Sequence, residues 1–261
     1  MSSLAYTLTD SRTMLRRNLV HMMRYPVLTL MVIGLPAVLL LLFVYVFGAT
    51  MGAGLGAAGA DGYVDYVVPG ILVIAIASSA QGTAITVAMD MTEGIVARFR
   101  TMAISRAAVL TGHVLGNVIQ TMIGVVAVIG VSLAVGFRPT AGPQEWLAVF
   151  GVLVLITFAI TWLSVALGMV SKSVETASNL PMFLFLLPFL GSGFVPTESM
   201  PGPLRWFAEN QPFTAWIETV RGLLTGTPIG NNGWLTIAWC AVIAFGSYLW
   251  ALHLYNTRST R

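Results

Sequence analysis

Charged residues and cysteine are scarce in this sequence of 261 residues. Asp, Glu, Lys and Arg make up 9% of the chain, well below the roughly 25% that soluble domains carry. Hydrophobic residues make up 57%, and the mean hydropathy is +0.85. These values exclude an ordinary soluble domain and predict an integral membrane protein. The single cysteine, Cys240, lies within an apolar run, so no disulfide can form within the chain.

Lysine is scarcer still, and this excludes the common kind of nucleotide site. A phosphate-binding loop needs Gly-Lys-Ser or Gly-Lys-Thr after a strand, but the sole lysine occurs in Ser171-Lys172-Ser173. If ATP drives this protein, another chain must hydrolyse it. The basic residues are scattered between apolar runs and form no concentrated basic face, so we expect no nucleic-acid partner.

Catalytic groups are missing as well. The sequence has no HExxH pattern and no Cys/His cluster, so it gives no support for a metal. Ser192 and His253 suggest a serine–histidine pair, but Leu190 stands where the serine motif of intramembrane proteases needs glycine. The clear apolar runs have no charge near their middle, which argues against an ion-coupled carrier. We predict no catalytic residue, metal or cofactor on this chain.

Apolar runs predict the fold. A helix needs about 20 apolar residues to cross the hydrocarbon core, and five runs reach that length while another, 180–194, is shorter. The five are 27–47, 66–89, 107–137, 146–170 and 234–255. We predict an all-α integral membrane protein with six transmembrane helices in a single domain of residues 1–261. We interpret the polar residues of the third run, His113, Asn117 and Gln120, as hydrogen-bond partners between helices.

Basic residues predict the orientation. With six spans, successive loops lie on opposite sides of the membrane. The two termini and the loops after the second and fourth spans share one side and hold ten of the 13 Lys and Arg residues. The other loops hold Arg138, Arg205 and Arg221. Because Lys and Arg gather on the cytoplasmic side of a membrane, both termini and the loop after the second span are expected in the cytoplasm. The protein is expected to be a multi-pass protein of the plasma membrane.

Two amphipathic segments flank the first two spans. In residues 1–26, Leu4, Leu8, Leu15, Leu19 and Met22 recur near helical spacing, opposite Asp10, Arg17 and Arg24. This predicts a helix in the inner membrane interface; a disordered basic tail is the alternative. In residues 91–106, one helix face carries Met91, Ile95, Phe99 and Met102 and the other carries Glu93, Arg100 and Ser105. Such a surface helix can bind a soluble partner, although an ordinary cytoplasmic loop has the same composition.

Short motifs recur across nearly the whole chain. They are Arg24-Tyr25-Pro26, Val68-Pro69-Gly70, Glu93-Gly94, Arg98-Phe99-Arg100-Thr101-Met102, Ile104-Ser105, Gly193-Phe194-Val195-Pro196, Met200-Pro201, Leu204, Asn210-Gln211-Pro212 and Arg221-Gly222-Leu223. Any one of them is weak, but their order and spacing are specific. Together they resemble the permease subunit of a type-2 ATP-binding-cassette exporter, in particular the daunorubicin-resistance permease group. Ala103 departs from the pattern, since the group often has proline there.

The resemblance implies partners and a division of labour. It implies a second permease copy, identical or homologous, and two copies of a separate ATPase subunit that binds ATP and Mg. It also implies that residues 1–26 and the coupling helix, 91–106, contact the ATPase, and that segment 195–233 folds into short re-entrant helices before the last span. The chain itself would be a transport subunit and no enzyme.

Site residues follow from this scheme as hypotheses. ATPase coupling is assigned to Glu93, Gly94, Arg98, Phe99, Arg100 and Met102. The two permease copies are expected to meet along spans one, two and five. Aromatic and small polar side chains suit a bulky, mostly apolar solute, so the pathway is assigned to Ser78, Ser79, Gln81, Thr83, Phe183, Phe185 and Phe189.

The expected function is export of drug-like or lipid-like amphipathic compounds. A permease for polysaccharides or lipid-linked glycans is the nearest alternative, although the few aromatic residues of the second span argue against it. An ATPase-independent channel or carrier is an alternative of another class, and a membrane anchor for an enzyme complex is compatible with the composition.

Overall fold

The protein is a bundle of helices in the computed structural model, which describes residues 26–54, 59–92, 106–171 and 173–257. No strand occurs in this part of the chain. The helices are α2 (Pro26–Leu41), α3 (Gly48–Gly54), α4 (Gly59–Thr92), α6 (Arg106–Val135), α7 (Pro143–Val170), α8 (Val174–Asn179), α9 (Met182–Leu186), α10 (Gly202–Asn210), α11 (Pro212–Thr225) and α12 (Asn232–Thr257). Between them lie the π-helical turn η1 (Leu42–Val46) and the 3₁₀ turns η3 (Leu187–Leu190) and η4 (Thr197–Ser199).

Four helices are long and apolar enough to cross a membrane. Their apolar stretches are Gly62–Met91, Val114–Val135, Pro143–Val170 and Asn232–Leu254. They coincide with the second, third, fourth and last predicted runs, so the prediction of long apolar helices there is confirmed. The first predicted run lies in α2 and η1, which contain the shorter apolar stretch Ile33–Val46. The total of six spans stays a prediction.

The fifth predicted span is a chain of short helices. Its apolar part, Val174–Leu190, is divided into α8, α9 and η3. Pro181 precedes α9 and Pro188 lies in η3, and proline cannot donate the hydrogen bond that continues a helix. The helical part ends at Leu190, earlier than predicted, because Gly191 adopts an extended conformation.

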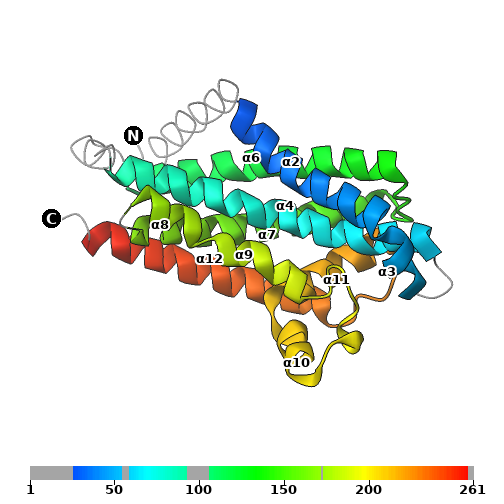
Figure 1. Cartoon of the computed structure of the whole chain (residues 1–261). Helices are drawn as coiled ribbons and strands as arrows, with labels where there is room; N and C mark the ends of the chain where they lie inside the picture. The colour runs from blue at the N-terminus through cyan, green and yellow to red at the C-terminus, as the bar shows by residue number, and fades with distance from the viewer. Residues whose placement is uncertain (1–25, 55–58, 93–105, 172, 258–261) are drawn as a thin grey trace.

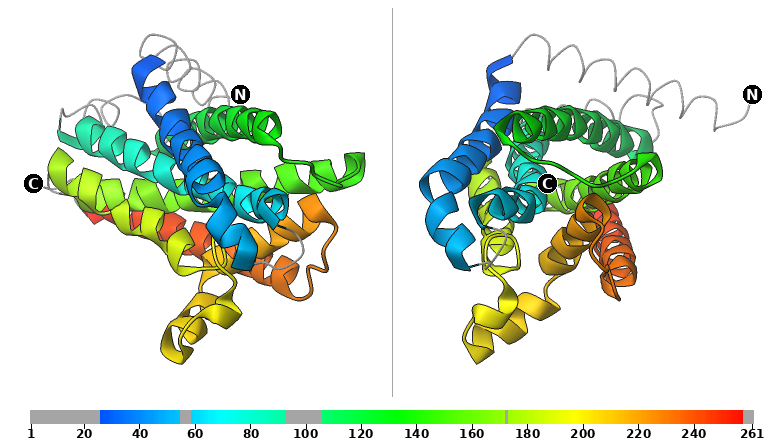
Figure 2. Two further views of the ribbon diagram at one scale, coloured as in Figure 1. Left: turned by 45° about the vertical axis from the view of Figure 1, so that its right-hand side comes forward. Right: turned by 90° about the vertical axis from the view of Figure 1, so that its right-hand side faces the viewer.

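Helix α4 is the centre of the bundle (Figure 2). Ile71 to Ala77 are all buried, which requires neighbours on every side of the helix. The helices that contact α4 are α2, α3, α6, α7, α8, α9 and α11, whereas α12 packs against α7 and α11. The apolar stretch of α4 is 72% buried and that of α12 only 22%. The rest of the chain therefore leaves most of the surface of α12 uncovered.

The bundle has two distinct ends (Figure 1). At the linker end, on the left, α4 ends at Thr92, α6 begins at Arg106 and α12 ends at Thr257. At the opposite end, here called the turn end, lie the loops 138–142 and 226–231. The turn 191–196 lies toward the turn end, and α10 extends away from the bundle there.

Local signals explain why α11 returns into the bundle before α12. Pro212 occupies its first turn, where no N–H is needed. Gly226 ends the helix in the left-handed conformation, with φ +71°, and donates its N–H to the Gly222 carbonyl. The Thr219 and Thr236 hydroxyls, 2.9 Å apart, then join α11 to α12.

Candidate functional site

The ATPase-coupling residues lie outside the described part of the chain. These are Glu93, Gly94, Arg98, Phe99, Arg100 and Met102, and most of the N-terminal segment is outside it too. The structure shows where the connection between spans two and three begins and ends, since Thr92 and Arg106 both lie at the linker end.

The four pathway residues of α4 do not share one environment. Ser79 and Thr83 are buried and donate to carbonyls of their own helix, Ile76 O at 2.7 Å and Ser79 O at 3.2 Å. Ser78 is half-buried and donates to Ala75 O at 2.9 Å. Gln81 is exposed, and its Nε2 donates to the Ser178 carbonyl of α8 at 3.1 Å. Of the four, Ser78 and Gln81 are therefore the ones at the surface of the bundle.

Gln81 is part of an exposed strip along α4. The strip consists of Gln81, Gly82, Thr86 and Met89, all exposed, at spacings that place them on one side of a helix. α2 and the α8–α9 segment contact α4; in Figure 1 α2 crosses in front of α4 and the α8–α9 segment runs below it. The strip is therefore a partly polar surface of an otherwise buried helix.

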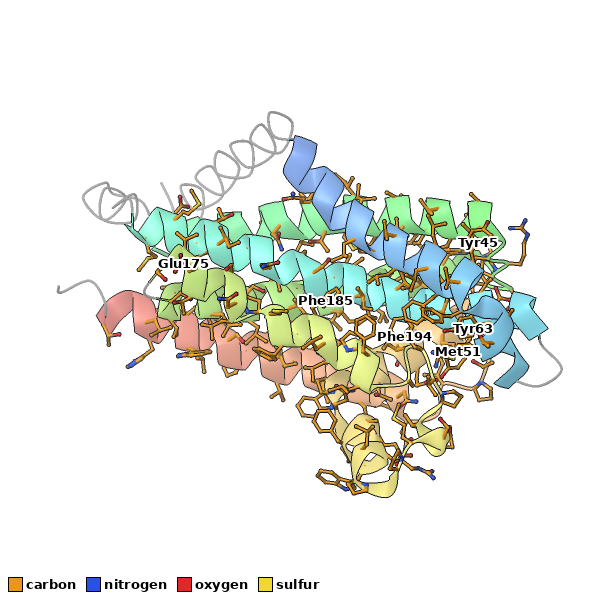
Figure 3. The ribbon with its side chains drawn as sticks, viewed as in Figure 1. Tyr45, Met51, Tyr63, Glu175, Phe185 and Phe194 are labelled. Carbon is orange, nitrogen blue, oxygen red and sulfur yellow. The ribbon has the colours of Figure 1, made fainter. Side chains whose placement is uncertain are left out.

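The three predicted phenylalanines also differ. Phe189 stacks on Phe194 with ring centroids 4.7 Å apart, and Phe194 stacks on Phe43 of η1 at 4.2 Å. Phe185 joins this aromatic cluster through Phe189, with ring centroids 5.7 Å apart. Figure 3 labels Phe185 and Phe194. Phe183 is exposed. The cluster thus connects the first predicted span to the fifth, and Phe183 lies on the surface beside it.

Interhelical hydrogen bonds account for one of the polar residues in the third span. Asn117 Nδ2 donates to Thr161 Oγ1 at 3.0 Å and so joins α6 to α7. The interpretation of Asn117 as a bond between helices is confirmed. Ser192 lies on the turn 191–196 and His253 on the last turns of α12 at the linker end, which separates the two residues of the rejected serine–histidine pair.

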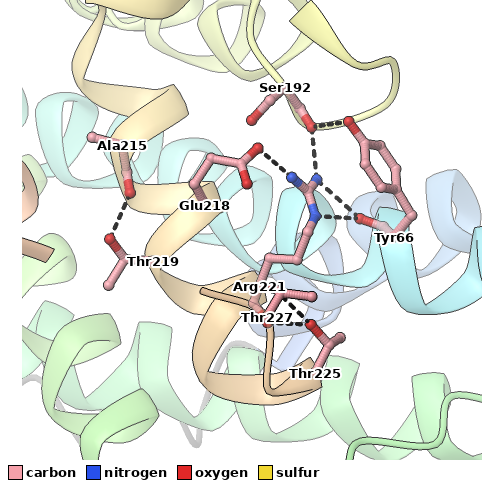
Figure 4. A network of polar contacts seen from close by, with 8 residues as sticks. All are labelled: Tyr66, Ser192, Ala215, Glu218, Thr219, Arg221, Thr225 and Thr227. Carbon is pink, nitrogen blue, oxygen red and sulfur yellow. Dashed lines mark hydrogen bonds and ion pairs between the residues drawn. The ribbon is translucent and has the colours of Figure 1, made fainter. Parts of the chain in front are cut away.

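A network of polar contacts surrounds Arg221 (Figure 4). Its guanidinium donates to Tyr66 O through Nε at 3.3 Å and Nη2 at 3.1 Å, and to Ser192 O through Nη2 at 2.7 Å. Nη1 pairs with the carboxylate of Glu218. The guanidinium carbon lies 3.8 Å from the centre of the Tyr66 ring, and the Tyr66 hydroxyl donates to Ser192 O at 3.0 Å.

Two glycines bring the backbones together beside this arginine. A Cβ atom placed on Gly70 of α4 would lie 2.7 Å from the Gly193 carbonyl oxygen and 2.9 Å from its Cα. No side chain larger than hydrogen fits between them. Gln211, just before α11, adds a bond from Nε2 to Leu187 O at 3.0 Å. We call Tyr66, Gly70, Ser192, Gly193, Glu218 and Arg221 the Arg221 joint.

Sequence reasoning missed this joint because it counted Arg221 among the basic residues of a loop. The structure corrects that interpretation: Arg221 is on a helix and only 7% exposed. The signal was present in the motifs, since Val68-Pro69-Gly70, Gly193-Phe194-Val195-Pro196 and Arg221-Gly222-Leu223 all contribute residues to the joint or lie beside it. Motifs far apart in the sequence thus meet at one place.

Known proteins resemble the chain over most of its length. The family model for the ABC-2 type transporter matches residues 9–225. A daunorubicin resistance ABC transporter permease protein of Streptomyces coeruleorubidus is 29% identical over 224 residues, which cover 85% of this chain and 77% of the relative. A probable doxorubicin resistance ABC transporter permease protein of Mycobacterium tuberculosis is 25% identical over 177 residues, covering 68% of this chain and 64% of the relative.

Proposed function

This chain belongs to the ABC-2 type transporter family, and on that premise we propose that it exports drug-like or lipid-like amphipathic compounds while a separate subunit hydrolyses ATP. The chain is a membrane-embedded permease with drug-resistance permeases among its relatives. The partner is an ATPase present in two copies, which carries the ATP and Mg.

The exposed strip of α4 is the observation that carries the proposal. Apolar side chains facing outward are expected of any membrane helix. The Gln81 amide is different: its Nε2 already bonds Ser178 O, but lipid offers no hydrogen-bond donor to its carbonyl oxygen. A second permease copy, identical or homologous, covers the strip. The pathway then forms where the two copies meet, with Ser78 and Gln81 on its wall.

Exposed apolar surfaces suited to this contact lie on segments that pack against α4. On α2 and η1 the exposed apolar residues are Leu35, Val38, Leu41, Leu42, Tyr45 and Val46, and beside them on α9 and its neighbours are Met182, Phe183, Leu186 and Leu190. They support the expectation that the copies meet along spans one, two and five. Phe183 faces the solute, while Phe185 and Phe189 hold the two flanking segments together.

The linker end faces the cytoplasm in this proposal, with both termini on that side, and the chain crosses the membrane six times. Glu93, Gly94, Arg98, Phe99, Arg100 and Met102 contact the ATPase. Segment 195–233 enters the outer leaflet. The exposed Trp206 and Phe207 of α10 support this placement, because aromatic side chains favour the membrane interface.

Export of a polysaccharide or lipid-linked glycan is less well supported. Such a cargo favours a pathway lined by aromatic residues, and in α4 no aromatic residue follows Tyr66. The absence of a charge near the middle of the long apolar helices argues against an ion-coupled carrier.

The test is purification of the chain with the product of any ABC ATPase gene found beside its own, followed by reconstitution into proteoliposomes. We expect the ATPase to co-purify, and daunorubicin to move across the membrane only with ATP. Gln81→Ala is expected to lower daunorubicin-stimulated ATP hydrolysis, whereas Ser79→Ala, whose hydroxyl bonds only to its own helix, is the matched control and leaves it unchanged. Transport without any ATPase would favour an independent channel or carrier and contradict the proposal.

Glu93→Arg tests the coupling segment separately. Reversal of charge at the ATPase contact is expected to weaken assembly or to uncouple ATP hydrolysis from daunorubicin transport. Unchanged assembly and coupling would remove Glu93 from the contact while leaving the export function in place.

A further inference from the structure

Arg221 is a buried cation that the transport pathway does not use. Arg221 is 7% exposed. Removing a charge from water is unfavourable unless hydrogen bonds and an opposite charge replace the water. Here Glu218 supplies the opposite charge and two carbonyls, Tyr66 O and Ser192 O, supply the acceptors. A buried ionisable group within a membrane protein is by default a candidate for function.

The acceptors belong to separate parts of the fold. Tyr66 is on α4, Ser192 is on the turn 191–196 and Arg221 itself is on α11. Because the guanidinium is planar and offers several N–H groups in fixed directions, it can bond both carbonyls at once. A lysine ammonium would keep the charge but would not match this geometry. Arg221 therefore fastens three elements to one another.

The contacts of the Arg221 joint lie on both sides of Pro69 in α4. Pro69 lies inside the helix and cannot donate the usual hydrogen bond to the carbonyl four residues earlier, so α4 bends most easily there. Tyr66, before Pro69, is held by Arg221. Gly70, just after it, packs directly against Gly193. With both sides attached to the same turn, α4 cannot bend at Pro69 without breaking contacts of the joint.

Helix α4 connects these contacts to the other end of the bundle. α4 is one continuous helix from the turn end to Thr92, where the segment that we propose to contact the ATPase begins. We propose that Arg221 is the positioning residue that transmits movement of α4 to the turn 191–196 and to α11, and so opens the pathway at the turn end. This inference rests on the proposed function, since it names how the same pathway is controlled.

The first experiment needs neither ATPase nor substrate. Hydrogen–deuterium exchange is measured on the purified full chain in lipid nanodiscs for wild type, Arg221→Gln and Arg221→Lys. Loss of the fastening is expected to speed exchange in residues 187–196 by about tenfold or more in Arg221→Gln, with a smaller change in Arg221→Lys. The matched control is Arg138→Gln, because Arg138 is an exposed arginine whose Nη1 donates only to carbonyls of its own segment, Leu133 O and Phe137 O.

The second experiment separates transmission from simple loss of structure. In proteoliposomes with the partner ATPase, daunorubicin transported per ATP hydrolysed is expected to fall about fivefold or more in Arg221→Gln, while the maximal rate of ATP hydrolysis changes less than about twofold. Arg221→Lys is expected to recover part of the ratio. Tyr66→Phe, which loses the hydroxyl bond to Ser192 O but keeps the ring and the carbonyl, is expected to shift the ratio slightly in the same direction, and it provides the test if Arg221→Gln does not fold.

Two results would overturn the inference. One is unchanged exchange in residues 187–196 of Arg221→Gln; the other is a fall of ATP hydrolysis and transport in the same proportion, which indicates only less folded protein. A wild-type complex without ATP-dependent transport of daunorubicin would count against the proposed function, and the exchange measurement would still decide whether Arg221 fastens α4 to the turn.

Discussion

Gly70→Ala is predicted to destabilise the protein although alanine is the better helix former. The new Cβ would lie 2.9 Å from the Gly193 Cα and 2.7 Å from its carbonyl oxygen. Both neighbours are backbone atoms, so no side-chain rotation relieves the contact. To restore a carbon–carbon separation of about 3.5 Å, α4 and the turn 191–196 must move apart by roughly 0.6 Å.

The expected magnitude follows from two opposing terms. Overpacking of a rigid contact costs up to about 3 kcal/mol, and alanine gains about 1 kcal/mol over glycine within a helix. The net loss of unfolding free energy is therefore about 2 kcal/mol. The separation also lengthens the 2.7 Å bond between Arg221 Nη2 and Ser192 O, so faster hydrogen exchange in the turn should accompany the loss of stability.

Gly82→Ala is the matched control on the same helix. A Cβ at Gly82 meets nothing within 4 Å, so only the helix-propensity gain of about 1 kcal/mol applies. Both variants are unfolded in mixtures of dodecyl maltoside and sodium dodecyl sulfate, with tryptophan fluorescence and circular dichroism as probes. If the two midpoints coincide, or if Gly70→Ala is the more stable variant, the close approach of the two backbones is refuted.

Two further predictions concern the stability of the bundle. Asn117→Ala removes the bond to Thr161, whose hydroxyl keeps a second bond to Thr157 O. The unfolding free energy should therefore fall by only about 0.6 kcal/mol. A loss above about 2 kcal/mol in the same unfolding assay would show that the bond does more than join two helices. Trp216→Ala empties a fully buried site beside Phe213 and should lower the unfolding free energy by about 3–5 kcal/mol. Its control is Trp206→Ala, at a residue that is 70% exposed, which should leave the unfolding midpoint in detergent unchanged. Equal midpoints for the two variants would contradict the packing described for α11.

The long helices were predictable because a membrane span is specified by a continuous apolar run. The runs at 66–89, 107–137, 146–170 and 234–255 require no knowledge of their neighbours, and the structure forms α4, α6, α7 and α12 there. The weakness of the fifth run was visible in its length. Its division into α8, α9 and η3 also follows from Pro181 and Pro188, which a search for apolar runs does not weigh.

The faces of α4 were not predictable, because a helix that is apolar on all sides gives no periodic signal. Ser78, Ser79, Gln81 and Thr83 were therefore treated as one group, whereas the structure buries Ser79 and Thr83 and leaves Gln81 exposed. Arg221 was different, since a signal existed. It lies at helical spacing with the apolar residues Ile217 and Leu224 of α11, which already indicates that it shares their buried face.

The length of α4 has a consequence for the surrounding lipid. Its apolar stretch of 30 residues is about 45 Å long, whereas the hydrocarbon core is about 30 Å thick. Fitting that stretch wholly inside the core would need an inclination of roughly 48°, beyond the usual limit of about 40°. Part of α4 must therefore lie outside the hydrocarbon core, at the level of the headgroups or beyond. In the proposed function these are the turns before Thr92, where the ATPase would reach them without entering the hydrocarbon core.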